Sequence, residues 1–380
     1  MKHSLLIITL LVACNYCFSQ SQNKAKGAHK LEIKINKNVE LLGLGYFIGF
    51  EGVDIENKTV DIDGKIIPKK DWHKYGYKIY QRFKRYVTSE NLAQCFSVAD
   101  HLWLDYLTAF VLQVKDVPNA KFPDDINQGY YLNFSKSKNP EEAKKNAIIF
   151  LDGLNAFAKE IEFQSHLNEA KPYYDQVLQE VENGIPDARF IDAMESFYKQ
   201  SYDTYLLVPS LTIPKGMGFG IKNTGKNETT VFNVFGALDY QEFDDIKKLN
   251  MGFANTSKLR ELSVHEFGHS FVNPVVAQLP LELFTKTEYL FEPLQSAMAD
   301  QGYNTWKVCV YEHFVRAGEI MIAHKLGNKE TATKLFYDYK EKRKFNYIPE
   351  ILEHLKKYDL GAYDSYKQTV RSTMEKLSQQ

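Results

Sequence analysis

The chain has 380 residues, of which 44% are hydrophobic and 25% are charged, proportions that are ordinary for a globular protein. This length suits one large domain or two closely packed ones. The formal net charge of −1 gives no electrostatic reason to expect binding to nucleic acid or to an anionic membrane surface.

The first residues have the pattern of an export signal. A short basic start is followed by an apolar run from Leu5 to Val12, which is too short to cross a bilayer as a mature helix. We therefore expect residues 1–20 to be removed as a signal peptide and the protein to be secreted or periplasmic, with no transmembrane span. A lipoprotein is the alternative, because residues 11–14 resemble a bacterial lipobox and would leave a lipid anchor at Cys14.

Three further regions follow, and we expect them to pack together as one compact unit. Residues 21–200 carry apolar side chains at helical spacing between prolines, which predicts a mainly helical N-terminal part. Residues 201–345 hold strands and the motif described below, and residues 346–380 are expected to form a helical tail. Cys95 and Cys309 could pair in a disulfide or remain buried thiols.

The pattern changes to β-structure ahead of the motif. Runs rich in β-branched and aromatic residues predict strands at Thr204–Val208, Gly216–Ile221 and Thr229–Phe235, with a turn between the last two. The last two strands should therefore form a hairpin. We expect Thr229–Phe235 to be an edge strand, whose unpaired main-chain groups could hydrogen-bond to another extended segment, with a central position in the sheet as the alternative.

The segment that carries chemistry is His265-Glu266-Phe267-Gly268-His269, which reads H-E-x-x-H. In a helix, residues four apart lie above one another on one face, so both imidazoles can reach one metal ion. Glu266 then points toward the open side of the metal, where it can act as a general base. The pattern predicts two zinc ligands, His265 and His269, and a catalytic carboxylate, Glu266.

Several signals predict that this segment is helical. Asn255-Thr256-Ser257 offers oxygen atoms that can cap a helix, and apolar residues recur at helical spacing from Leu259 to Phe271. The helix is expected to end at Asn273-Pro274. We expect Asn273 to cap this end, with support of a histidine ring as the alternative role of Asn273. A glycine in the middle of a helix costs about 1 kcal/mol relative to alanine. We attribute the presence of Gly268 to close approach of another backbone, or of the metal and the substrate.

A catalytic zinc ion usually keeps three protein ligands, so a third ligand is expected after this helix. Glu312 is the preferred candidate, because it falls in one long helical pattern from about Leu294 to Leu326 and a rigid helix positions a ligand well. Glu288 is the alternative, since its spacing from the motif matches some glutamate-type zinc peptidases. His313 and Asp300 are further alternatives.

Other side chains near Glu312 could serve the same site. Arg316 lies one turn after Glu312 and could orient its carboxylate, or could form only a surface ion pair. A tetrahedral oxyanion would need a hydrogen-bond donor beyond the metal, and Tyr303, Tyr311 and His313 are the candidates.

Three stretches carry a wider likeness: Asn38–Leu41, the block from His265 to Pro274, and Glu312–Ala317. In these stretches the chain resembles a family of secreted bacterial proteins that has metallopeptidase features and no assigned function. More broadly, it resembles the gluzincin group of zinc peptidases, which bind the metal through two histidines and a glutamate. The resemblance implies that His265, His269 and Glu312 bind zinc and that Glu266 is the base.

The residue patterns predict an α+β fold that is mostly helical. The resemblance implies a zincin-like catalytic core, in which a small mixed or antiparallel sheet accompanies the active-site helix. Together they lead us to expect a secreted peptidase that hydrolyses peptide or protein substrates with Zn²⁺ and with Glu266 as general base. Two alternatives are a catalytically inactive zinc-binding relative and a surface interaction protein in which the motif occurs by chance.

Overall fold

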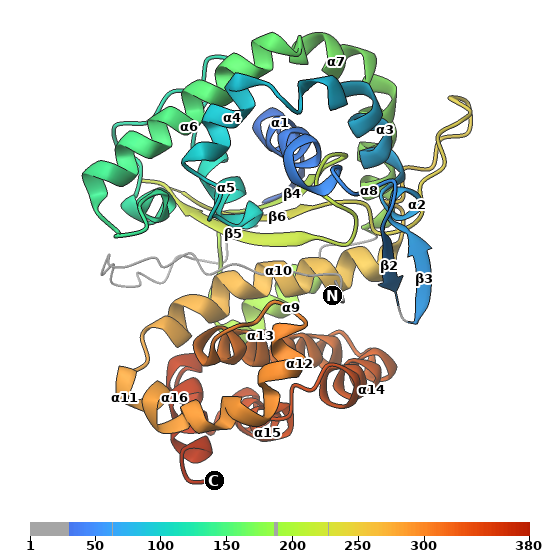
Figure 1. The fold of residues 1–380 in the computed structure, drawn as a ribbon. Coiled ribbons are helices and arrows are strands. Elements are labelled where there is room, and N and C mark those ends of the chain that lie inside the picture. The colour runs from blue at the N-terminus through green and yellow to red at the C-terminus, as the bar shows by residue number, and fades with distance from the viewer. Residues whose placement is uncertain (1–29, 63, 186–188, 227) are drawn as a thin grey trace.

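The computed structural model describes residues 30–62, 64–185, 189–226 and 228–380 (Figure 1). The expected signal peptide and the lipobox at Cys14 lie outside these residues. The fold is α+β and mostly helical, as the sequence predicted. None of the helices that the structure describes combines the length and apolarity needed to cross a membrane.

A four-stranded mixed sheet forms the centre of the molecule. Its strands, in sheet order, are β1 (Lys30–Ile33), β4 (Thr204–Pro209), β6 (Thr229–Phe235) and β5 (Gly218–Thr224). The first three strands are parallel, and β5 pairs with β6 in antiparallel fashion as the predicted hairpin. The prediction that Thr229–Phe235 is an edge strand was wrong, because β4 and β5 pair with it on both sides. The edge beside β6 is β5.

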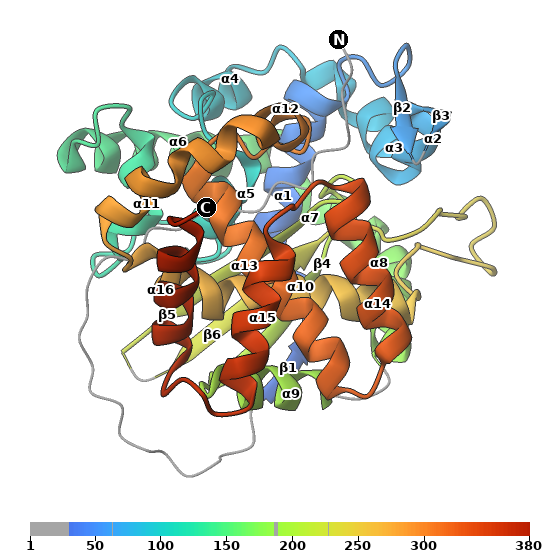
Figure 2. The ribbon, with the colours of Figure 1, turned by 90° about the horizontal axis from the view of Figure 1, so that it is seen from below.

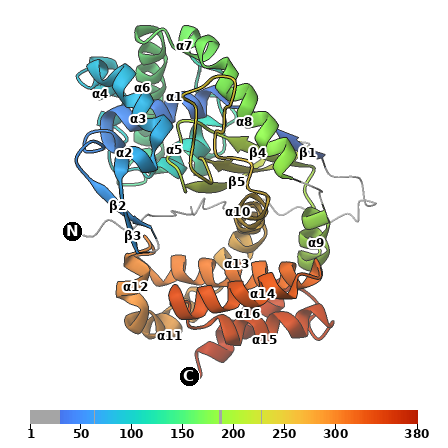
Figure 3. The same ribbon diagram turned by 90° about the vertical axis from the view of Figure 1, so that its right-hand side faces the viewer.

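Helices from the first half of the chain cover one face of this sheet, as Figure 1 shows. They are α1 (Lys37–Tyr46), α3 (Lys74–Phe83), α4 (Glu90–Ser97), α5 (Leu104–Val111), α6 (Pro140–Glu160), α7 (Phe163–Glu169) and α8 (Lys171–Gly184). Shorter segments join them: η1 (Phe47–Glu51), α2 (Lys69–Trp72), η2 (Lys84–Tyr86), η3 (Gln128–Tyr130) and η4 (Leu132–Phe134). A separate hairpin of β2 (Thr59–Ile62) and β3 (Lys65–Pro68) lies beside α2 (Figure 3).

The other face is covered by α10 (Thr256–Ala277), and the C-terminal helices lie beyond it (Figures 1 and 3). These are α11 (Leu281–Thr287), η5 (Glu288–Leu294), α12 (Gln295–Ala299), α13 (Trp306–Lys325), α14 (Lys329–Tyr337), η6 (Asp338–Lys342), α15 (Ile348–Asp359) and α16 (Tyr366–Leu377), together with α9 (Arg189–Tyr198). Figure 2 shows them from below, lying across α10 and the sheet. The motif helix is therefore enclosed between the sheet and α13.

The helix α10 begins where the sequence predicted and ends later. The Asn255 side chain accepts a hydrogen bond from the Lys258 backbone N–H at 3.0 Å and caps the helix. The helix was expected to end at Asn273-Pro274, but it continues to Ala277. Pro274 cannot donate to the Ser270 carbonyl, and the Tyr202 hydroxyl donates to this oxygen instead, at 2.6 Å. The lost helical hydrogen bond is thus replaced by a tertiary one, which explains why the proline is tolerated.

The expected long helix from Leu294 to Leu326 is interrupted. The helix α12 ends at Ala299 and α13 begins at Trp306. Gly302 has a φ of 90°, and the Thr305 hydroxyl accepts a hydrogen bond from the Val308 backbone N–H at 3.3 Å as a new N-cap. Gly302 and Thr305 thus separate the two helices. The prediction of one long helix failed because apolar residues keep helical spacing on both sides of this turn.

The two cysteines that follow the expected signal peptide remain as thiols. Cys95 lies in α4 and Cys309 lies in α13, and both are buried and free. Of the two states that the sequence left open, the structure therefore has the buried thiols.

Candidate metal centre

The helix α10 presents two histidines on the face that is turned toward α13. His265 and His269 are both buried, and their Nε2 atoms lie 3.3 Å apart. Two imidazoles one helical turn apart can meet in this way because i and i+4 share a face. Gly268 lies on the same side of the helix as α13, where a Cβ would lie 3.4 Å from the Val315 side chain. Among the described residues, its nearest neighbour is thus a side chain of α13 and not the backbone of another element.

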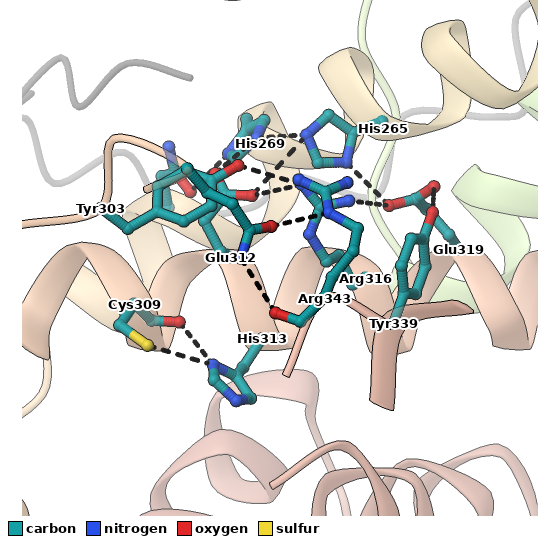
Figure 4. A network of polar contacts seen from close by, with 12 residues as sticks. His265, His269, Tyr303, Cys309, Glu312, His313, Arg316, Glu319, Tyr339 and Arg343 are labelled. Carbon is teal, nitrogen blue, oxygen red and sulfur yellow. Dashed lines mark hydrogen bonds and ion pairs between the residues drawn. The ribbon is translucent and has the colours of Figure 1, made fainter. Parts of the chain in front are cut away.

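Glu312 comes to the same place from the middle of α13 (Figure 4). Its Oε1 atom lies 3.5 Å from Nε2 of His269, and its Oε2 atom lies 3.8 Å from Nε2 of His265. The carboxylate is 1% exposed. Burial opposes its ionisation, but the charges of His269 and Arg316 outweigh this effect and lower the pKa of Glu312. Two nitrogen atoms and a charged carboxylate therefore converge in a buried space.

The other candidates for the third ligand lie elsewhere. Glu288 is exposed where η5 begins, and Asp300 is exposed in the turn after α12. His313 is buried, but its Nδ1 atom lies 2.8 Å from the Cys309 carbonyl and its ring packs among aromatic side chains away from the two histidines (Figure 4). Of the four candidates, the structure thus brings only Glu312 to the histidines.

Each histidine has a second partner on its Nδ1 atom. Oε1 of Glu319 lies 2.7 Å from Nδ1 of His265, and the Tyr339 hydroxyl donates to Oε2 of Glu319 at 2.6 Å. Oδ1 of Asn273 lies 3.2 Å from Nδ1 of His269. The expected helix-capping role of Asn273 was wrong, because the helix continues past it; the histidine-supporting role is the one that the geometry favours. A hydrogen bond at Nδ1 leaves the lone pair of Nε2 for a metal ion.

Arg316 connects the carboxylates of this site. It donates from Nη2 to Oε2 of Glu312 at 3.1 Å and to the Tyr303 hydroxyl at 3.0 Å. Its Nη1 atom lies 4.0 Å from Oε1 of Glu319. The residue is 2% exposed, so the surface ion pair that the sequence left open is excluded. Burial raises the pKa of Glu319 to about 7, against the opposing charge of Arg316. The guanidinium therefore balances negative charge beside the histidines.

Glu266 lies on the side of α10 that faces β5. It is fully buried, and neither side-chain oxygen has a hydrogen-bond partner among the described residues. Burial, and then the charge of Glu312, raise the pKa of Glu266 well above its usual range. A ligand atom of this carboxylate lies within 4.8 Å of those of both histidines. His265, Glu266 and His269 form a buried cluster that could hold a metal ion, with Glu312 adjacent.

Two glycines of β5 let the sheet approach Glu266 closely. A Cβ at Gly218 would lie 2.9 Å from Oε1 of Glu266, and a Cβ at Gly220 would overlap the main-chain carbonyl of Glu266. The Gly236 backbone N–H donates to the Met217 carbonyl, so the main-chain groups of Met217 point toward β6. Because this direction alternates along a strand, the main-chain groups of Gly218 and Gly220 point to the open edge of the sheet. The edge strand thus passes directly over the candidate base.

Sequence reasoning missed Glu319, Tyr339 and the glycine pair. Glu319 could have been found, because it lies seven residues after Glu312 and therefore on the same face of α13. Gly218 and Gly220 could have been found as alternate positions on one face of a predicted strand. Tyr339 gave no signal, because it joins the site from a separate element, η6.

Comparison with known proteins identifies a family for this chain but does not identify an activity. A protein-family profile described as "Domain of unknown function (DUF4932)" matches residues 31–371. No curated protein and no solved structure matches the chain. The matched range contains every residue of the centre described above.

Proposed function

The chain belongs to the DUF4932 family, whose description names no activity, and we propose from the geometry of its buried centre that it is a zinc-dependent peptidase. The observation that carries this proposal is the set of contacts among His265, His269 and Glu312, at 3.3, 3.5 and 3.8 Å. Beside them lies Glu266, a buried carboxylate with no partner of its own among the described residues.

The residues present fit a zinc ion. Donor atoms at about 2.0–2.2 Å from a tetrahedral zinc ion are separated from one another by roughly 3.3–3.6 Å. The two histidine nitrogens, 3.3 Å apart, and Oε1 of Glu312, 3.5 Å from His269, lie in this range, and the second carboxylate oxygen, Oε2, lies 3.8 Å from His265. Two imidazole nitrogens and one carboxylate are a ligand set of catalytic zinc sites, in which a fourth position stays open. We therefore assign His265, His269 and Glu312 as ligands.

The two carboxylates divide naturally into two roles. Glu312 is held by Arg316 and has a lowered pKa, so it suits a permanent negative ligand. Neither oxygen of Glu266 has a hydrogen-bond partner among the described residues, so this carboxylate suits a group that takes and returns a proton. A zinc ion supplies Lewis acidity that polarises a peptide carbonyl and makes water a stronger nucleophile near neutral pH. Glu266 would accept the proton of the attacking water and pass it to the leaving amine.

Tyr303 is the candidate donor for the developing oxyanion. Its hydroxyl accepts a hydrogen bond from Arg316, and Figure 4 shows it beside Glu312. A phenol hydroxyl held in this place by Arg316 is a group of the type that stabilises an oxyanion. His313 no longer competes for this role, since it lies on the other side of α13. Tyr311 precedes Glu312 by one position and is therefore turned about 100° around the helix.

The strand β5 suggests how a peptide would be held. Its outer edge has no neighbouring strand among the described residues, and it passes over Glu266. An extended peptide could add to this edge through main-chain hydrogen bonds, with the scissile carbonyl close to the base. The Lys222 carbonyl is already bonded to the Tyr130 hydroxyl at 2.6 Å, which would limit pairing toward that end. Secretion of the chain stays part of this proposal.

Elemental analysis with matched variants tests the centre. We expect about one zinc ion per chain in the wild type and in Glu288→Gln, whose carboxylate is exposed, and loss of zinc in Glu312→Gln. The wild type should cleave members of a mixed peptide library, and a chelator should stop the cleavage. Glu266→Gln should retain zinc and lose cleavage. Iron in place of zinc, or cleavage by Glu266→Gln at the wild-type rate, would contradict the proposal.

A further inference from the structure

Arg343 is a second arginine beside the metal centre, and the proposed mechanism has not used it. It follows η6, and its backbone N–H donates to the Asp338 carbonyl at 2.9 Å. Its Nε atom donates to Oε1 of Gln301 at 2.8 Å, and Nε2 of Gln301 donates back to the Arg343 carbonyl at 2.9 Å. The arginine is thus held at both its backbone and its side chain by one glutamine from the turn after α12.

The guanidinium of Arg343 lies next to that of Arg316. Figure 4 shows the two side chains beside each other, on the side of α13 that carries Glu312. Both guanidinium groups lie over the Tyr339 and Phe345 rings: Arg316 at 4.9 and 4.7 Å from the ring centroids, and Arg343 at 6.0 and 5.5 Å. The charge of Arg343 also acts on His265 and Glu312. Arg343 therefore belongs to the same electrostatic centre as the metal ligands.

The two arginines differ in their counter-ions. Arg316 has Glu312 at 3.1 Å and Glu319 at 4.0 Å. Within the described residues, no carboxylate lies at ion-pair distance from Arg343, and the one side chain that accepts a hydrogen bond from it is the neutral Gln301. Burial and the neighbouring positive charge of Arg316 lower the pKa of Arg343. An anionic group that binds beside Arg343 would supply the carboxylate partner that this arginine lacks among the described residues.

The terminal nitrogens of Arg343 can receive such a group. Neither has a hydrogen-bond partner among the described residues, and the residue is partly exposed, whereas Arg316 is buried. A guanidinium whose Nε is already held presents its two terminal N–H groups in a fixed plane, a geometry that matches a carboxylate. Oriented by Gln301, Arg343 needs little further ordering on binding.

We propose that Arg343 binds a carboxylate of the peptide substrate beside the metal centre and thereby selects peptides that carry a negative charge near the scissile bond. This inference rests on the proposed peptidase function. The carboxylate has two sources, the free C-terminus of the peptide or an Asp or Glu side chain. Arg343 is thus a specificity-determining residue that contacts substrate, and Gln301 is the residue that positions it.

Matched peptides test the proposal. N-acetylated peptides of varied sequence are compared as free acids and as C-terminal amides, and a second amidated set compares Glu with Gln at each position. We expect the wild type to prefer the carboxylate form in one of the two comparisons by about 10- to 100-fold in kcat/KM. Arg343→Met should bring this ratio close to one. Gln301→Glu should also lower it, because the new carboxylate would lie at the Nε atom and compete with the substrate.

Two controls separate this inference from the function on which it rests. Arg371→Met removes an exposed arginine that pairs with Glu375 on α16, and it should leave the ratio unchanged. Zinc-loaded Glu266→Gln, immobilised, should retain the carboxylate peptides preferentially, a binding measurement that needs no cleavage. If the wild type cleaves nothing, the peptidase proposal fails, and retention still decides the role of Arg343. The inference is overturned if neither peptide comparison shows a preference, or if Arg343→Met and Gln301→Glu, both folded, keep it.

Discussion

Glu319 contacts His265 on the opposite side of the imidazole ring from Glu312. The Oε1 atom of Glu319 lies 2.7 Å from Nδ1, while Nε2 of the same ring faces the Glu312 carboxylate at 3.8 Å. Both glutamates come from α13, two turns apart, so a single helix presents one carboxylate to each side of the site. The ring is thereby held in the orientation and protonation state in which Nε2 can bind a metal ion.

Removal of Glu319 should weaken metal binding without removing a ligand. In Glu319→Ala the His265 ring loses the partner that fixes its tautomer, and we expect zinc affinity to fall about 10- to 100-fold. Competition with a chromogenic chelator measures this affinity directly. Glu330→Ala, which removes an exposed carboxylate at the start of α14, is the control and should bind zinc as the wild type does. Equal affinities in the two variants would contradict the supporting role of Glu319.

The contact between β5 and α10 should not tolerate a side chain. A methyl group at Gly220 would overlap the main-chain carbonyl of Glu266, so the strand or the helix must shift. We expect Gly220→Ala to lower the free energy of unfolding by about 1–3 kcal/mol, as in other overpacked interiors. Chemical denaturation measures the loss. Gly49→Ala is the control, because its new methyl group would lie 3.9 Å from its nearest neighbour, the Phe96 ring. A Gly220→Ala variant as stable as Gly49→Ala would show that the close approach is not required.

A buried glutamate on the opposite face of the sheet should make stability depend on pH. Glu40 in α1 is fully buried, accepts a hydrogen bond from the Tyr174 hydroxyl at 2.8 Å, and has a pKa raised by burial to about 7. The folded state therefore holds a proton that the unfolded state releases above about pH 4.5. Stability should accordingly fall as pH rises from about 4.5 to 7, by roughly 3 kcal/mol at most.

Glu40→Gln tests this dependence, because the amide oxygen can still accept from Tyr174 and the group no longer ionises. We expect the variant to be more stable than the wild type at pH 8, with the difference shrinking toward pH 4.5. Urea denaturation at several pH values gives both curves. Parallel curves for the two proteins would mean that Glu40 does not titrate in this window. Glu282→Gln, an exposed carboxylate paired with Lys286, should leave the wild-type curve unchanged.

The sequence alone predicted much of the local structure around the site. The spacing of His265 and His269 implied one shared helix face, and Asn255 marked the start of that helix. Hairpin turn signals correctly paired β5 with β6. These features depend on neighbours within a few residues, where helical periodicity, capping and turn preferences act directly. The preference for Glu312 over Glu288 also came from local pattern, since a rigid helix was expected to carry the ligand.

Only the tertiary structure decided which distant groups meet. The hydroxyl of Tyr202 replaces the hydrogen bond that Pro274 cannot make, so the motif helix runs past its expected end. The order of the strands, which makes β5 and not β6 the edge beside Glu266, depends on pairing with β4. Arg343 lies at the centre with its side chain hydrogen-bonded to Gln301, which is 42 residues away in the chain. Such contacts join residues far apart in the chain, and no local periodicity encodes them; they follow from how whole helices and strands bury their apolar faces together.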